Sequence, residues 1–400
     1  MAARPHRAPA ALRALGLGAL LFASVGAPAP FPALPAAPRP APPPAGLPGF
    51  VLQSVPVGLP PRLVEAGDLD GDTDLDLLVL AQDADTTRTL VLRNHGAAGF
   101  GQWWFEDIDW PVPTWGLDLE LGDVDGDADL DLVLLVPIYG LLVRFNAGDG
   151  TFDAFGAPSD QGLNVDNELA DIDGDSILDI AHYELDLGGY VGSRRGNGDG
   201  TFALMVDLPL FPPNQADLRM ALAELTGDGL TDMLLAANTG LYLVRGQSIP
   251  PFFPSWQTPA LLLASGTFRD VTTAGLNGDS LTDIVATRPN AGEVAVLLGQ
   301  TGGLAAPVLY PAGLLPAAIA VADLDADGAP DVVVANQRGA TISLLAGDGR
   351  GGLLAPTSTK VGRQLTDVTP ADLDGDGDVD LAVTDAISAS VVLMRNQLVP

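Results

Sequence analysis

The sequence predicts an all-β fold, a seven-bladed β-propeller of four-stranded blades whose ring is closed by an N-terminal strand in the last blade. Three observations predict it. A short run rich in Val, Leu and Ile follows each copy of a nine-residue acidic loop, and a Gly or Ala precedes each copy. A fixed period near fifty residues is typical of repeat architectures. The seven copies start 48 to 55 residues apart, at positions 68, 123, 171, 224, 275, 323 and 372.

Each repeat carries signals for four strands. In the first repeat, one strand is predicted directly after the loop at 75–80 and a second at 89–93. A third strand begins near an aromatic residue such as Phe152, and a fourth runs into the next loop, as at 63–67. These runs are short, apolar and bounded by turn residues, which is a strand signal. Four strands in each of seven repeats are the pattern of propeller blades.

The residues before the loops indicate a closed ring rather than an open stack. Small side chains are suited to inner strands that crowd around a central axis. The last repeat lacks an outermost strand, and a spare strand at 50–57 precedes the first repeat. We expect that strand to supply the missing edge and to close the ring. The small residues are Gly67, Gly122, Ala170, Ala223, Ala274, Ala322 and Ala371.

The loop itself has the composition of a cation site. Its clearest copy, Asp372 to Asp380, has carboxylates at positions 1, 3, 5 and 9 and glycine at position 4. Glycine permits a tight turn because it adopts positive φ at little steric cost. Ca²⁺ takes about six to eight oxygen ligands, and clustered carboxylates without a cation would repel one another. The loops hold 28 of the 51 acidic residues, so one Ca²⁺ in each would reduce the net charge from −32 to −18.

The Asp-x-Asp-Gly-Asp-x-x-x-Asp loops and the Asn-Gly-Asp-Gly-Thr-Phe segment at 197–202 resemble the FG-GAP/VCBS repeats, which also form the propeller of integrin α subunits. The resemblance covers about residues 48–400. It implies Ca²⁺ in the loop that joins the first and second strands of a blade. In the five complete loops the implied ligands are Asp68, Asp70, Asp72 and Asp76; Asp123, Asp125, Asp127 and Asp131; Asp171, Asp173, Asp175 and Asp179; Asp323, Asp325, Asp327 and Asp331; and Asp372, Asp374, Asp376 and Asp380.

Two loops depart from this pattern. The fourth loop offers Glu224, Thr226, Asp228 and Asp232. The fifth has Gly275 at position 1 and offers Asn277, Asp279 and Asp283. For both, an acidic turn without metal remains an alternative, so about five to seven Ca²⁺ ions are expected. At position 7 a backbone carbonyl ligand is expected from Asp74, Asp129, Ile177, Leu230, Leu281, Ala329 and Asp378.

Rival metal motifs do not match these loops. An EF-hand requires a glutamate at position 12 and flanking helices, whereas strands are predicted here. In the sixth loop Ala326 occupies the position where glycine is usual, which predicts backbone strain rather than a lost ligand.

The amino-acid composition limits the classes of partner and of stabilising site that the chain can have. The formal net charge of −32 argues against nucleic acid or an anionic membrane as a partner. The chain has no cysteine, so neither disulfides nor zinc–cysteine sites are available. We expect stability to come from core packing, strand pairing and bound metal.

The first part of the chain predicts export. Arg4, Arg7 and Arg13 precede an apolar run at 14–25, followed by small residues, which is the order of a secretory signal peptide. We predict a signal peptide at 1–27, a Pro/Ala-rich linker at 28–47 and the propeller at 48–400. No later segment is long and apolar enough to span a membrane. A secreted, extracellular or periplasmic protein is expected.

No catalytic motif of recognised spacing occurs in the sequence. The expected function is therefore non-catalytic: a monomeric binding or adhesion module for an extracellular protein or carbohydrate. A lectin-like carbohydrate binder is one alternative, and a polysaccharide-degrading enzyme is a more distant one. Exposed aromatic residues in the cluster of Trp103, Trp104, Trp110 and Trp115 could stack on a sugar ring or anchor a protein partner, although packing between blades is the simpler interpretation.

Overall fold

A computed structural model describes residues 49–83, 87–94, 104–108, 118–136, 140–152, 164–184, 189–203, 208–209, 218–247, 255–263 and 266–397. The predicted signal peptide and linker lie outside these residues, as do three of the four clustered tryptophans. The described part of the chain is all-β and contains no helix. It therefore contains no apolar helix of membrane-spanning length.

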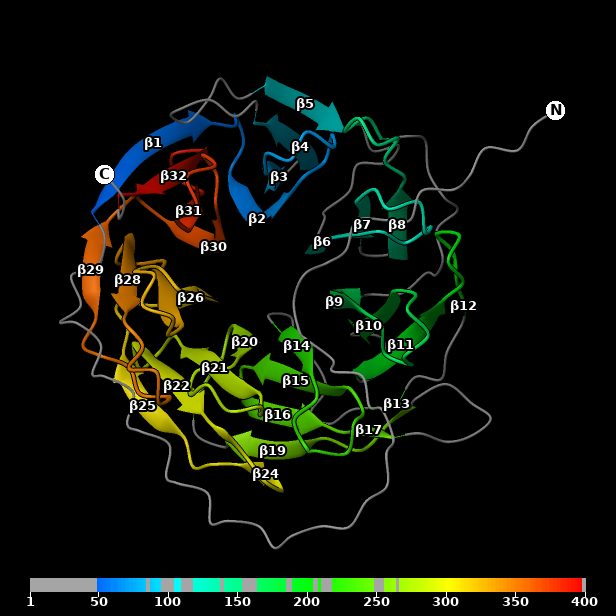
Figure 1. Cartoon of the computed structure of the whole chain (residues 1–400), viewed down its shortest axis with the longest axis vertical. Helices are drawn as coiled ribbons and strands as arrows, with labels where there is room; N and C mark the ends of the chain where they lie inside the picture. The colour runs from blue at the N-terminus through cyan, green and yellow to red at the C-terminus, as the bar shows by residue number, and fades with distance from the viewer. Residues whose placement is uncertain are drawn as a thin grey trace, which may run out of the picture. The chain divides into compact units, whose positions relative to one another are not determined.

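Seven sheets follow the seven repeats and are arranged as the blades of a propeller (Figure 1). Each blade is numbered by its repeat, and its strands are given from the innermost outward. Blade 1 contains β2 (Pro61–Gly67), β3 (Asp76–Gln82), β4 (Thr87–Arg93) and β5 (Trp104–Ile108). Blade 2 contains β6 (Asp118–Gly122), β7 (Asp131–Val136) and β8 (Gly140–Arg144). Blade 3 contains β9 (Asn164–Ala170), β10 (Asp179–Glu184) and β11 (Tyr190–Gly196), with β12 (Phe202–Ala203) and β13 (Leu208–Pro209) both paired to β11.

The remaining blades each have four strands in the described residues. Blade 4 contains β14 (Arg219–Ala223), β15 (Asp232–Ala237), β16 (Gly240–Val244) and β19 (Ala260–Leu263). Blade 5 contains β20 (Val271–Ala274), β21 (Asp283–Arg288), β22 (Glu293–Leu297) and β25 (Val308–Pro311). Blade 6 contains β26 (Pro316–Ala322), β27 (Asp331–Asn336), β28 (Thr341–Leu345) and β29 (Thr357–Lys360). Two short ribbons pair β17 (Gly246–Gln247) with β18 (Ser255–Trp256) and β23 (Gly299–Gln300) with β24 (Gly303–Leu304).

Blade 7 combines strands from both ends of the described chain. It contains β30 (Leu365–Ala371), β31 (Asp380–Asp385), β32 (Ser390–Asn396) and, at its outer edge, β1 (Phe50–Pro56). Strand β1 runs antiparallel to β32, with Phe50 opposite Asn396 and Pro56 opposite Ser390. The innermost strands contact one another in the order β2, β6, β9, β14, β20, β26 and β30, and β30 also contacts β2.

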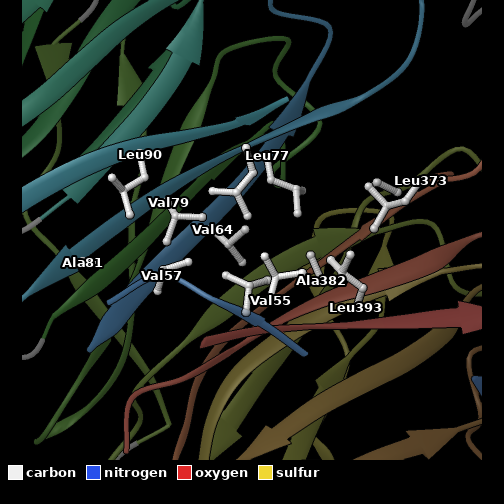
Figure 2. Packing of buried hydrophobic residues seen from close by; sticks show 13 residues of the cluster. Val55, Val57, Val64, Leu77, Val79, Ala81, Leu90, Leu373, Ala382 and Leu393 are labelled. Carbon is white, nitrogen blue, oxygen red and sulfur yellow. The ribbon is translucent and has the colours of Figure 1, made fainter. Parts of the chain in front are cut away.

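The hydrophobic core is divided among the interfaces between blades. Seven clusters of buried residues each join two neighbouring blades. Between blades 7 and 1, Val55 of β1 packs with Val64, Leu77 and Leu393 (Figure 2). The second strand of each blade is buried on both faces, because a neighbouring blade covers each face. This explains why these strands are almost continuously apolar instead of alternating.

The small residue before each loop has a specific packing reason. A Cβ atom on Gly67 would lie 2.7 Å from Cδ1 of Leu130, which belongs to the loop of the next blade. A Cβ atom on Gly122 would likewise lie 2.7 Å from Cδ1 of Leu178, in the loop of the third blade. The side chain of one repeat therefore fills the space that the glycine of the previous repeat leaves open. Trp256 is buried in the cluster between blades 3 and 4, where it serves packing.

Candidate metal centres and the central channel

The acidic loops share several backbone hydrogen bonds. In the first loop, the N–H groups of Gly71 and Thr73 donate to the two carboxylate oxygens of Asp68, at 2.8 and 3.0 Å. Both donors adopt positive φ, 75° and 80°. The second, third and seventh loops repeat this arrangement. In all seven loops, the N–H of position 7 donates to the carboxylate of position 5. The two incomplete loops share this bond, but Ser280 at position 6 of the fifth loop is not among the residues with positive φ, so that loop turns differently there.

Five loops bring three carboxylates close enough to share an ion. One oxygen from each member lies within 4.8 Å of the others. The loops concerned are the five that carry the complete sequence pattern, and the fourth and fifth loops form no such set among the described residues. The sets are Asp68, Asp70 and Asp72; Asp123, Asp125 and Asp127; Asp171, Asp173 and Asp179; Asp323, Asp325 and Asp331; and Asp372, Asp374 and Asp380.

The aspartate at position 9 also makes hydrogen bonds to the backbone, which the sequence did not predict. Its side chain is buried in every loop. In the first loop, Oδ2 of Asp76 accepts the N–H of Leu69, and Oδ1 accepts the N–H of Asn94 at the end of β4. The same pair of bonds recurs in all seven repeats. This residue therefore ties the loop to the far end of the adjoining hairpin, whether or not the loop is complete.

Burial disfavours the charged form of these aspartates. It raises the pKa of Asp76 from its ordinary value of 3.8 to about 6 and that of Asp380 to about 7. The charges of the acidic neighbours Asp70 and Asp374 contribute to these raised pKa values. A divalent cation would reverse this effect, because an opposite charge nearby favours the ionised carboxylate.

The donor set fits Ca²⁺, a hard cation that prefers oxygen ligands. Asp70 gives direct support, because its Oδ1 atom is buried and accepts no hydrogen bond within the described residues. Leaving a buried acceptor unsatisfied costs about 1–3 kcal/mol, and more for a charged group. A cation beside Asp68, Asp70 and Asp72 would satisfy that oxygen.

A second group of carboxylates lies at the axis of the propeller. The innermost strands of the blades border a cavity of about 340 Å³, which we call the central channel. Its acidic residues are Glu65, Asp118, Glu120, Asp166, Glu168, Asp270 and Asp367, and Arg219 lies among them. In β6 and in β9, two of these residues stand two positions apart, which places both on one face of the strand.

Several channel carboxylates join one blade to the next. Asp118 accepts the N–H of Asn167, Asp166 that of Met220, and Asp367 that of Val64. Glu65 and Asp270 make equivalent bonds across two further interfaces. Arg219 donates to both Asp118 and Asp166, at 2.8 and 2.7 Å. A sequence signal was present: Asp118, Asp166, Asp270 and Asp367 each stand four residues before the Gly or Ala that precedes a loop.

Residues 275–334 and 323–383 match the family model described as FG-GAP-like repeat. These two spans contain the fifth, sixth and seventh loops. The similarity to FG-GAP-like repeats is therefore shown for residues 275–383. No curated protein matches this chain.

Solved structures share the fold. A lectin of Agrocybe aegerita, described by its recognition of non-reducing terminal N-acetylglucosamine, is 19% identical, with a TM-score of 0.55; the match covers 84% of this chain and 86% of the lectin chain. BBS1N, solved in complex with ARL6DN, is 14% identical, with a TM-score of 0.59 and coverage of 88% and 98%. At these identities the similarity supports the propeller fold alone.

Proposed function

We propose that this protein is a secreted, calcium-stabilised β-propeller that acts as a non-catalytic binding module for an extracellular protein or carbohydrate. The observation that carries the calcium part is the set of five carboxylate clusters at equivalent positions of five blades. Ca²⁺ bound there would stabilise the folded protein, because it binds the folded state in preference to the unfolded chain.

The chain's own residues prepare these sites. Backbone N–H groups fix the position-1 carboxylate, and the position-9 carboxylate holds the loop against the hairpin. An ion in the loop would therefore link the start of the second strand to the end of the third. In an extracellular setting, weak sites with dissociation constants of about 10⁻⁴–10⁻³ M can fill.

A metal count and a thermal melt test the calcium proposal. The purified protein should carry five or more Ca²⁺ ions by elemental analysis. Chelation should lower its melting temperature strongly, and added Ca²⁺ should restore it. If the protein carries no calcium and melts identically with and without chelator, the loops are acidic turns that bind no metal.

Carbohydrate is the ligand class that a specific observation favours, since one structural neighbour is a lectin that recognises terminal N-acetylglucosamine. A glycan array separates this candidate from a protein-binding module. Saturable binding to a defined glycan class would support the lectin-like function, and a blank array would direct the search to protein ligands. Release of reducing ends from a polysaccharide panel would instead indicate an enzyme.

The proposed secretion rests on the predicted signal peptide at 1–27. Expression of the complete gene product and fractionation of the culture test it. Recovery of a shortened chain outside the cytoplasm supports export, whereas a full-length cytoplasmic protein contradicts it.

A further inference from the structure

Three of the five carboxylate clusters are in contact with an arginine from the same blade. Arg195 in the third blade places Nε 2.8 Å from Oδ2 of Asp173 and Nη2 2.6 Å from Oδ2 of Asp175. In the first blade, Nη1 of Arg93 lies 3.4 Å from Oδ2 of Asp70. In the seventh, Arg395 pairs with Asp374, whose side chain has no exposed surface, and approaches Asp376 at 3.8 Å.

These arginines occupy one structural position. Each directly precedes the residue whose N–H donates to the position-9 aspartate: Asn94, Gly196 or Asn396. In the second and sixth blades the same position holds Phe145 and Ala346, which carry no charge. The complete loops therefore fall into two classes, three with a guanidinium at the cluster and two without.

The fourth blade supplies an internal comparison. Arg245 occupies the equivalent position, before Gly246. Its loop forms no three-carboxylate cluster within the described residues, and Arg245 itself is exposed. An arginine at this position is thus paired with the loop where the loop carries the complete acidic pattern.

We propose that Arg93, Arg195 and Arg395 are internal counter-cations of their loops, so that the first, third and seventh loops bind Ca²⁺ more weakly than the second and sixth. This proposal rests on the proposed calcium function. The guanidinium compensates the clustered carboxylates when no ion is bound, and it repels the ion that replaces it or binds beside it. The second and sixth loops fill first as Ca²⁺ rises, and the arginine-paired loops fill at higher concentration.

The magnitude follows from Coulomb's law. A single positive charge about 5 Å from a divalent ion, in a solvent-exposed setting, weakens binding by roughly tenfold. Arg195 is the best residue to test, because its side chain is 48% exposed and its removal leaves no cavity in the core. The loop that it contacts retains all of its aspartates.

Calcium titration of the complete, metal-free protein by isothermal calorimetry tests the proposal. We expect the wild type to show two tight sites and three sites about tenfold weaker. Arg195→Ala should convert one weak site into a tight one, and the triple replacement of all three arginines should give five similar sites. Arg195→Lys keeps the charge and should preserve the weaker class. Arg245→Ala is the matched control and should leave the titration unchanged.

A second measurement separates this role from a purely structural one. Without Ca²⁺, Arg195→Ala should lower the melting temperature, because the carboxylates of the third loop lose their partner. With saturating Ca²⁺ the difference from wild type should shrink. An unchanged or weakened set of sites in Arg195→Ala would overturn the proposal while leaving the calcium function intact. A wild-type protein that binds no Ca²⁺ would overturn both.

Discussion

The buried aspartate at position 9 shows how one residue can serve the fold in every blade. Asp283 belongs to the loop whose position 1 is glycine, so it can be examined largely apart from metal binding. Its Oδ2 accepts the N–H of Leu276 at 2.8 Å, and its Oδ1 accepts the N–H of Gly299 at 2.8 Å. The side chain has no exposed surface.

We predict that Asp283→Asn lowers the free energy of unfolding by about 1–3 kcal/mol, because the amide nitrogen of the new side chain would face a backbone donor. Urea unfolding in the presence of chelator measures the change. Asp279→Asn, on an exposed side chain of the same loop, is the control and should change stability by less than about 0.5 kcal/mol. Equal losses of stability in the two variants would contradict the role of Asp283 in holding the loop against the hairpin.

The strain predicted at Ala326 is present in the structure. Ala326 has a φ of 55°, whereas the equivalent Gly375 has a φ of 74°. A side chain in this region costs roughly 1–2 kcal/mol. No heavy atom lies within 4 Å of the place where a Cβ atom on Gly375 would stand, so backbone strain rather than a clash opposes a side chain there.

We therefore predict opposite effects from the two exchanges. Ala326→Gly should raise the free energy of unfolding by about 1 kcal/mol, and Gly375→Ala should lower it by a similar amount. Denaturant unfolding at fixed Ca²⁺ measures both. Changes of the same sign would show that φ at position 4 does not govern the stability of these loops.

At the scale of the strand hairpin, an asparagine links neighbouring blades. Asn146 follows β8, and its Nδ2 donates to the carbonyl of Leu69 in the previous blade at 2.8 Å and to that of Leu130 at 3.2 Å. Asn94 and Asn396 make equivalent bonds in two other blades. The sixth blade has Gly347 at this position, where a Cβ atom would lie 2.2 Å from the carbonyl oxygen of Pro330.

Asn146→Gly should destabilise the protein by about 2 kcal/mol or more, since it removes buried hydrogen bonds both within and between blades. Thermal or urea unfolding measures the loss. Asn197→Gly removes an exposed side chain whose Nδ2 donates to Thr201 within the same turn, and it should have a smaller effect. If Asn197→Gly proved the more damaging of the two, the inter-blade link would not be a stabilising element.

The elements differed in how far the sequence could predict them. The loops and the strand after each were predictable because their spacing and chemistry are local. So was the choice of the five loops that gather carboxylates, although each set joins three of the four predicted side-chain ligands. The pairing of Arg195 with Asp173 was not, since it joins residues 22 positions apart across a hairpin. The bonds from Asp118 and Asp367 to other blades were also missed, because their partners are 49 and 303 positions away. Such contacts can be predicted only when the arrangement of neighbouring blades is known.

At the scale of the whole molecule, the central channel is lined by acidic residues that do not belong to any of the seven loops. Burial and, to a smaller extent, the charges of Asp118 and Asp367 together raise the pKa of Glu65 from its ordinary value of 4.5 to about 8. Burial likewise raises the pKa values of Glu120 and Glu168. Neutral carboxyl groups are therefore favoured where three consecutive blades place glutamates beside one another.

This environment gives a pH dependence with a definite sign. The folded protein holds the Glu65 proton more tightly than the unfolded chain, so the stabilisation is complete below about pH 4.5 and is lost as pH rises toward 8. Glu65→Gln is neutral at every pH and can still accept the N–H of Leu121. Its melting temperature should be closest to that of wild type near pH 4.5 and exceed it by a few degrees near pH 8.5.

Melting curves at several pH values and saturating Ca²⁺ measure that difference. Asp199→Asn is the control, because a hydrogen bond from Thr201 lowers the pKa of Asp199 and keeps it ionised across this range. The control should differ from wild type by a constant amount between pH 5.5 and 8.5. A constant difference for Glu65→Gln as well would mean that the channel carboxylates are charged throughout, and that solvent or a bound cation offsets their repulsion.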